Sequence, residues 1–148
     1  MGHEARRDDK GRRRLTDEER QDLLDLPLTA VWSTLSAMGR IHSVPVHFTR
    51  TGGELRVLTE WDSVKCRNAL RTGRATLCVE TTLDDTDRRY VTAEGPVRFE
   101  RPVSSADLTA LDLRYGRDDA DAFEQHSFLG SVMMVLQPEH WIAWSDAD

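Results

Sequence analysis

A stretch rich in basic and hydroxyl side chains, residues 59–77 (T-E-W-D-S-V-K-C-R-N-A-L-R-T-G-R-A-T-L), carries the groups best suited to bind an anion. A strand-like alternation ends at Thr59, and a helical pattern follows that carries Ser63, Lys65 and Asn68. The first N–H groups of a helix have no intrahelical partner, and the positive end of the helix dipole lies behind them. A helix start of this kind attracts anions before any side chain is added.

The side chains of this corner should converge on one point. Lys65 lies in the first helical turn, and Asn68 follows at i+3 on the same face. Thr59 ends the incoming strand and can direct its hydroxyl toward them. A hydroxyl, an ammonium, a carboxamide and free N–H groups suit a phosphomonoester. The alternative interpretation is a capped surface helix with ordinary solvated bases, and the spacing alone leaves both open.

Length and charge limit the classes of partner. The 148 residues suit one domain, and the net charge is −6. Residues 1–14 hold six basic and three acidic residues, which leaves −9 for residues 15–148. We predict a disordered basic leader over 1–14 and a single domain over 15–148. An acidic body repels phosphate backbones, so we expect no nucleic-acid partner.

The sequence shows no membrane or secretion signal. No apolar run approaches the roughly 20 residues that span a bilayer, and residues 1–14 lack the apolar region of a signal peptide. We therefore expect a cytoplasmic protein without a membrane partner. Cys66 and Cys78 are too few to suggest a metal-ligand set. His42 and His47 are an odd number of positions apart on one predicted strand and should face opposite sides, so no metal site is expected.

Hydrophobic patterning places the elements around this corner. A helix is predicted from Thr16, with Glu19 as its capping-box partner, to Pro27. Alternation predicts strands at 29–36, 41–49, 54–60, 74–82, 88–100, 131–138 and 141–145. Helical spacing predicts helices at 63–71, around 108–115, and from Phe123. Pro45, inside the second strand, predicts an edge, a bulge or a ligand-facing gap. Gly95–Pro96 predicts a bulge or bend.

Short consecutive strands joined by tight turns favour a mainly β fold with inserted helices. We predict an antiparallel barrel of six to seven strands rather than a Rossmann sheet. Neither G-x-G-x-x-G nor G-x-x-x-x-G-K-[ST] occurs, so a nucleotide phosphate would have to be held in another way.

The order of four segments resembles a known family. They are T-A-V-W-S-T-L-S-A-M-G-R-I-H-S-V-P-V-H-F, G-G-E-L-R-V-L-T, S-V-K-C-R-N-A-L-R-T-G-R-A-T-L-C-V-E and R-Y-V-T-A-E-G-P-V-R-F. Together they resemble the pyridoxamine 5′-phosphate oxidase-like FMN-binding split barrels, and most closely the small actinobacterial flavin/deazaflavin oxidoreductase type. The resemblance covers about residues 15–144.

The resemblance implies a split β-barrel homodimer that binds FMN in the grooves between protomers. It implies a flavin-dependent oxidoreductase that transfers hydride to a small organic substrate, with reduced nicotinamide, NAD(P)H, as a possible electron donor. It places the cofactor phosphate at Thr59, Ser63, Lys65 and Asn68. It places the flavin ring along Ser43, Val44, Pro45, Val46 and His47. The partner protomer would contribute Arg89, Tyr90 and Trp141. No catalytic acid or base is implied.

Two departures from the family shape the alternatives. The additional arginines and histidines that bind the substrate phosphate of pyridoxal-phosphate oxidases are missing, so vitamin B6 oxidation is not expected. Arg67, Arg71 and Arg74 could serve the tail of the deazaflavin F420, and an F420-dependent reductase is therefore the first alternative. A non-catalytic flavin or haem binding protein is the second alternative, with haem the least favoured cofactor.

Overall fold

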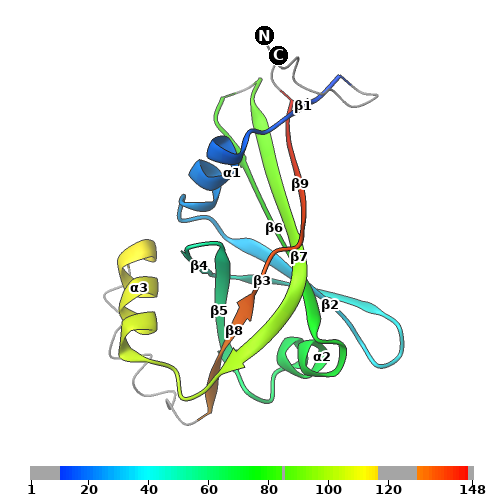
Figure 1. The fold of residues 1–148 in the computed structure, drawn as a ribbon, viewed down its shortest axis with the longest axis vertical. Helices are drawn as coiled ribbons and strands as arrows, with labels where there is room; N and C mark the ends of the chain where they lie inside the picture. Colours follow the sequence, from blue (N-terminus) through cyan, green and yellow to red (C-terminus); the bar gives the residue numbers. More distant parts are fainter. Residues whose placement is uncertain (1–10, 85, 117–129, 147–148) are drawn as a thin grey trace.

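The computed structural model describes residues 11–84, 86–116 and 130–146, which form strands and three helices. The strands are β1 (Arg13–Arg14), β2 (Ala30–Leu35), β3 (Ile41–Val46), β4 (Thr49–Thr51), β5 (Glu54–Glu60), β6 (Arg74–Thr82), β7 (Arg88–Glu100), β8 (Ser131–Leu136) and β9 (His140–Ser145). The helices are α1 (Asp17–Leu24), α2 (Val64–Thr72) and α3 (Ser105–Tyr115). Figure 1 shows α2 and α3 on different sides of the strands.

The strands pair in the order β3-β2-β6-β7-β8-β5-β4, and β9 pairs with both β7 and β1. All of these pairs are antiparallel. Seven of the nine strands have six or more residues, and the other two, β1 and β4, are short. The predicted mainly β fold, a six- to seven-stranded antiparallel split barrel with inserted helices, is therefore confirmed.

Strand β7 joins the two halves of the barrel. Arg89–Glu94 pair with β9, whereas Val97–Glu100 pair with β8, so the strand changes its neighbour around Gly95. Figure 1 shows β7 curving through the centre of the molecule. Its pairing with β6 runs in one register through Pro96, so the predicted bulge or bend takes the form of a curve without an inserted residue. A side chain at Gly95 would begin 2.0 Å from the carbonyl oxygen of Gln137, and this close approach requires glycine.

The strand predicted over 41–49 is wrong in its extent. The chain forms β3 up to Val46 and then β4 from Thr49, and these two strands belong to different halves of the barrel. Between them, the N–H of Phe48 donates to the hydroxyl of Tyr115 at 3.0 Å, and the Phe48 side chain is fully buried. The backbone therefore leaves the ladder at His47–Phe48 because a side chain from α3 satisfies it there.

Pro45 lies on an edge strand. β3 is the first strand of the pairing order and bonds to β2 alone among the strands of the described residues. The sequence predicted an edge, a bulge or a ligand-facing gap at Pro45, and the structure shows an edge. Proline suits this position because it has no N–H to donate to a second neighbouring strand.

Local sequence signals begin and end each helix. Thr16 caps α1 in a capping box with Glu19, as predicted. Ser63 caps α2, which ends at Gly73 in the left-handed conformation. Ser104 caps α3 in the same way. The helix predicted from Phe123 lies outside the described residues.

The main core lies inside the barrel, where Trp32, Phe48, Leu55, Leu77 and Met134 are fully buried. A smaller cluster (Val103, Leu111, Met133 and Val135) lies under α3. The two clusters face opposite sides of β8, and α3 is thereby packed onto the barrel wall.

The disorder predicted for residues 1–14 remains a prediction for residues 1–10, which lie outside the described part. Arg13–Arg14 do form a short strand against β9. Ordered structure therefore begins inside the predicted leader. Within the described residues, no helix is long and apolar enough to cross a membrane.

Candidate functional site

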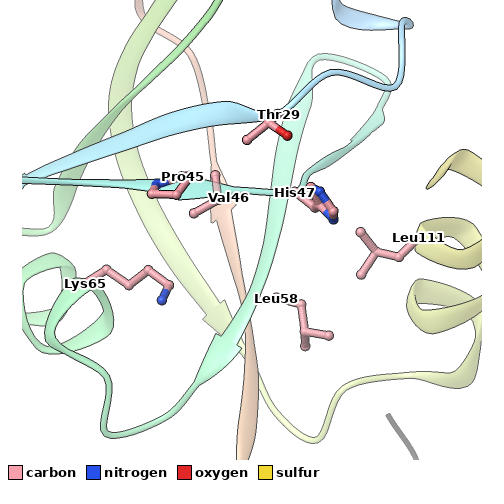
Figure 2. Close-up of a pocket in the computed structure, with 7 residues that line it drawn as sticks. All are labelled: Thr29, Pro45, Val46, His47, Leu58, Lys65 and Leu111. Carbon is pink, nitrogen blue, oxygen red and sulfur yellow. The ribbon is translucent and has the colours of Figure 1, made fainter. Parts of the chain in front are cut away.

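A cavity of about 460 Å³ opens between β3, β5, α2 and α3. Its lining consists of Thr29, Pro45, Val46, His47, Leu58, Lys65 and Leu111. Figure 2 shows the Lys65 side chain extending from α2 toward the space below Pro45 and Val46, with Leu58, His47 and Leu111 beyond it. This volume lies within the roughly 300–1,000 Å³ range of small-molecule sites.

Lys65 gives the cavity its charge. No hydrogen bond or ion pair joins its ammonium to another described residue, and no Asp or Glu of the described residues lines the cavity. Lys65 is partly exposed and lies in the first turn of α2, where the helix dipole adds positive potential. The cavity therefore offers an uncompensated cation to an anionic ligand.

The neighbouring hydroxyls of the corner lie together. The hydroxyls of Thr59 and Ser63 share a hydrogen bond of 3.0 Å, and Ser63 also accepts from the N–H of Cys66 at 3.3 Å. Their mutual bond uses one of the two hydroxyl protons, so one donor remains for a ligand. Neither residue belongs to the cavity lining, but Ser63 caps the helix that carries Lys65, and Thr59 lies near the end of β5, just before it.

Asn68 does not join this group in the structure. Its side chain is buried, and its amide donates to the hydroxyl of Thr34 on β2 at 3.2 Å. The i+3 spacing places Asn68 on the same helical face as Lys65, but its amide bonds to Thr34 of the barrel wall. Its predicted contact with a phosphate stays a prediction.

Cys66 serves the core rather than the site. The side chain is fully buried, and burial raises the pKa of its thiol despite the nearby charges of Arg101 and Lys65. A raised pKa disfavours the thiolate, which is the nucleophilic form.

The edge strand β3 supplies one wall of the cavity through Pro45 and Val46, and His47 follows it. The other two residues predicted beside a flavin ring lie apart from the lining. The Ser43 hydroxyl bonds to Ser33 at 2.8 Å on the outer face, and Val44 packs against the core. Three of the five predicted residues therefore meet at the cavity.

Helix α3 closes the far side of the cavity. The ring of His47 stacks on Tyr115 with centroids 4.0 Å apart and an angle of 12° between planes. The Tyr115 hydroxyl lies 2.9 Å from the carbonyl of Leu28, to which it donates, and it also meets the backbone of Phe48. These contacts fix both rings.

The residues expected from a partner protomer lie outside this cavity. Arg89 pairs with Asp87 at 3.0 Å and with Glu19 at 3.2 Å. The Tyr90 ring lies under Arg12. Trp141 lines a separate cavity of about 210 Å³, where the guanidinium of Arg20 lies 4.1 Å from its ring centroid. One chain therefore does not bring these residues to Lys65, and their predicted role from a second chain stays a prediction.

Sequence reasoning missed Thr29, Leu58 and Leu111 as lining residues. The spacing of Leu111 with its neighbours predicted a helix, but nothing in that spacing indicated that the helix faces β3. In the described part of the chain, no three His, Cys, Asp or Glu residues gather as metal ligands would.

Solved structures share this architecture. A conserved hypothetical protein of Mycobacterium tuberculosis aligns with a TM-score of 0.75 and 18% identity, covering 89% of this chain and 86% of that chain. An F420 reductase aligns with a TM-score of 0.68 and 21% identity over 82% and 94% of the two chains. An FAD and haem binding protein of Mycobacterium smegmatis aligns with a TM-score of 0.65 and 18% identity over 87% and 70%.

No protein-family model and no curated protein matches the sequence. The structural likenesses show that the chain has the split-barrel fold found in flavin-, F420- and haem-binding proteins. At these identities the likenesses show the fold alone. The ligand of this chain has to be inferred from its own residues.

Proposed function

We propose that the chain is a flavin-dependent oxidoreductase, pyridoxamine 5′-phosphate oxidase-like in type, that binds FMN in the Lys65 cavity and transfers hydride to a small organic substrate. The observation that supports this proposal is the uncompensated ammonium of Lys65 in a cavity with no acidic lining residue among those described. A phosphate ester is the kind of ligand that such an isolated cation favours.

The residues present fit FMN in two respects. Lys65 and the remaining hydroxyl donor of the Thr59–Ser63 pair can bind the phosphate. β3 is an edge strand, and alternate residues of an edge strand direct N–H and C=O groups outward. A flavin ring carries both hydrogen-bond donors and acceptors, so this edge can orient it, while Val46 and Leu58 exclude water.

When bound, FMN would supply the hydride chemistry, and the protein would contribute position and electrostatics. Lys65 would hold the phosphate and thereby fix the distance of the ring from α2. The His47–Tyr115 stack would limit how far the ring can slide toward α3. Reduced nicotinamide is the proposed electron donor.

A homodimer is part of the proposal, because several apolar side chains on one face of the barrel are exposed in the described part of the chain. One row of directly paired residues crosses five neighbouring strands, so its members share one face of the sheet. The row consists of Pro45, Val31, Cys78, Thr92 and Ile142. At the hairpin end of β2 and β3, Leu35 pairs with Ile41, whose side chain is 78% exposed. A second copy of the chain would cover this surface and border the cavity at Pro45.

The dimer can be tested by sedimentation of the full chain and of an Ile41→Asp variant. We expect a dimer for the unmodified chain and a monomer, or a much weaker dimer, for the variant. A matched Met38→Asp change in the adjacent turn, at an 81% exposed side chain, should leave the dimer intact. A chain that sediments as a monomer at all concentrations would contradict the proposal.

An F420-dependent reductase is the second candidate, and the similarity of the fold to an F420 reductase favours it. Absorbance titrations of the purified chain with FMN, F420 and haemin distinguish the candidates. Tight FMN binding followed by oxidation of NAD(P)H supports the proposal. Exclusive binding of F420 supports the second candidate, and a bound flavin or haem without turnover supports a carrier. Binding of none of the three would refute all of them.

A further inference from the structure

The Lys65 cavity has two chemically different ends. Lys65 extends into it from α2, whereas Leu58 and Leu111 lie at the opposite side, between β5 and α3 (Figure 2). Of the described lining residues, Lys65 alone carries a permanent charge. Among the described residues, the end near α3 therefore combines the apolar side chains of Leu58 and Leu111 with the edge of the His47 ring, and it holds no carboxylate or permanent cation.

The apolar wall is held from outside the cavity. Arg56 of β5 donates to both carboxylate oxygens of Asp107 on α3 at 3.1 Å. Arg114, at the end of α3, donates to the carbonyls of Leu24 and Leu26 at 2.6 and 2.7 Å. With one end of α3 bonded to β5 and the other to the end of α1, the position of Leu111 is set before any ligand enters, as in most small-molecule sites.

We infer that the substrate of this site is an uncharged, largely apolar organic molecule that binds against Leu58 and Leu111. The inference rests on the proposed function, because it assumes that the FMN phosphate occupies Lys65 and that the ring lies along Pro45–His47. Thr29, Leu58 and Leu111 are then the described lining residues that remain, and none of them can neutralise an anion or a cation. A charged substrate would lose its hydration there without compensation, which strongly disfavours its binding.

The test compares two probes with one ring system, 2-acetylnaphthalene and 2-naphthoate, by ligand-observed NMR on the full chain. In the chain saturated with FMN, the neutral ketone should bind at least about tenfold more tightly than the carboxylate. In the cofactor-free chain, Lys65 is available, so the carboxylate should bind as tightly as the ketone or more tightly. Reversal of the preference by FMN is the expected signature.

Two variants locate the subsite on α3. Leu111→Asn should weaken binding of the ketone by about tenfold, since it places an amide in the apolar wall, and should change the Kd of FMN by much less. Leu113→Asn, on the same helix with its side chain 80% exposed, should change neither. Leu58→Asn tests the same wall from β5, in case the Leu111 variant does not fold.

The outcomes separate the two proposals. If FMN fails to bind, the proposed function is refuted and the inference falls with it. If FMN binds and the loaded chain still prefers the carboxylate, only the inference is overturned. Equal effects of the Leu111 and Leu113 variants would likewise overturn the assignment of the subsite to this wall.

Discussion

Replacing Lys65 by alanine should weaken FMN binding and leave riboflavin binding unchanged. The Lys65 ammonium has no partner among the described residues, so its removal leaves no other group unpaired inside the protein. The loss is therefore the contact with the phosphate itself. A hydrogen bond to a charged group contributes about 1.5–3 kcal/mol. At about 1.4 kcal/mol per factor of ten, the Kd of FMN should rise about 10- to 150-fold.

The assay is a fluorescence titration of FMN and of riboflavin, which lacks the phosphate, with the unmodified chain and two variants. Arg67→Ala is the matched control, since Arg67 is exposed on the same helix and does not line the cavity. Higher salt should weaken FMN binding to the unmodified chain more than to the Lys65 variant, because salt screens partly exposed charges.

Two results would refute this reasoning. Unchanged FMN affinity in the Lys65 variant would mean that the cation does not meet the phosphate. Equal loss of FMN and riboflavin would mean that Lys65 supports the shape of the cavity rather than the charge of the ligand. A loss in the Arg67 variant as large as that in the Lys65 variant would indicate a general effect of charge on α2.

Two further predictions concern stability. Hydrogen bonds from Arg13 hold the pKa of Glu19 at about 2, below its ordinary value of 4.5. This partly exposed pair should therefore add about 1 kcal/mol to the free energy of unfolding above pH 4.5. That contribution should be lost as the pH falls toward 2. Glu19→Gln should reduce the difference in the free energy of unfolding between pH 7 and pH 3, measured with urea, by up to about 1 kcal/mol, and an unchanged difference would contradict the prediction. Gly95→Ala should lower the free energy of unfolding by about 2 kcal/mol or more, because its Cβ would meet the Gln137 carbonyl. Gly53→Ala, where a Cβ meets no atom within 4 Å, should show much less in the same urea assay.

The fold was largely predictable because each strand and helix carries its own local signal. Alternation marked the long strands, and Thr16, Ser63 and Gly73 marked the ends of helices. The break at His47–Phe48 was not predictable, since the apolar alternation continues through it. What ends β3 is the hydroxyl of Tyr115, a group 67 residues further along the chain than Phe48.

The candidate site was predictable only in part, for a similar reason. The sequence identified Lys65 and the neighbouring hydroxyls because a helix start has a recognisable pattern. It did not predict the bond of Asn68 to Thr34, since helical spacing gives the face of a helix but not the partner that the barrel presents to that face. Leu58 and Leu111 were missed because an apolar residue that lines a cavity has the same periodicity as one in the core.

The position of β8 has a consequence for how the chain acquires its fold during synthesis. β8 lies between β5 and β7, and Val132–Leu136 are fully buried. Residues 1–136 must therefore leave the ribosome before either neighbour can pair with the whole of this strand. Until then β5, whose Leu58 belongs to the cavity wall, presents an open edge, and such edges invite pairing with other chains. The strand that carries Leu58 thus gains its second neighbour late, and chains stalled before Ser131 should aggregate rather than bind a ligand.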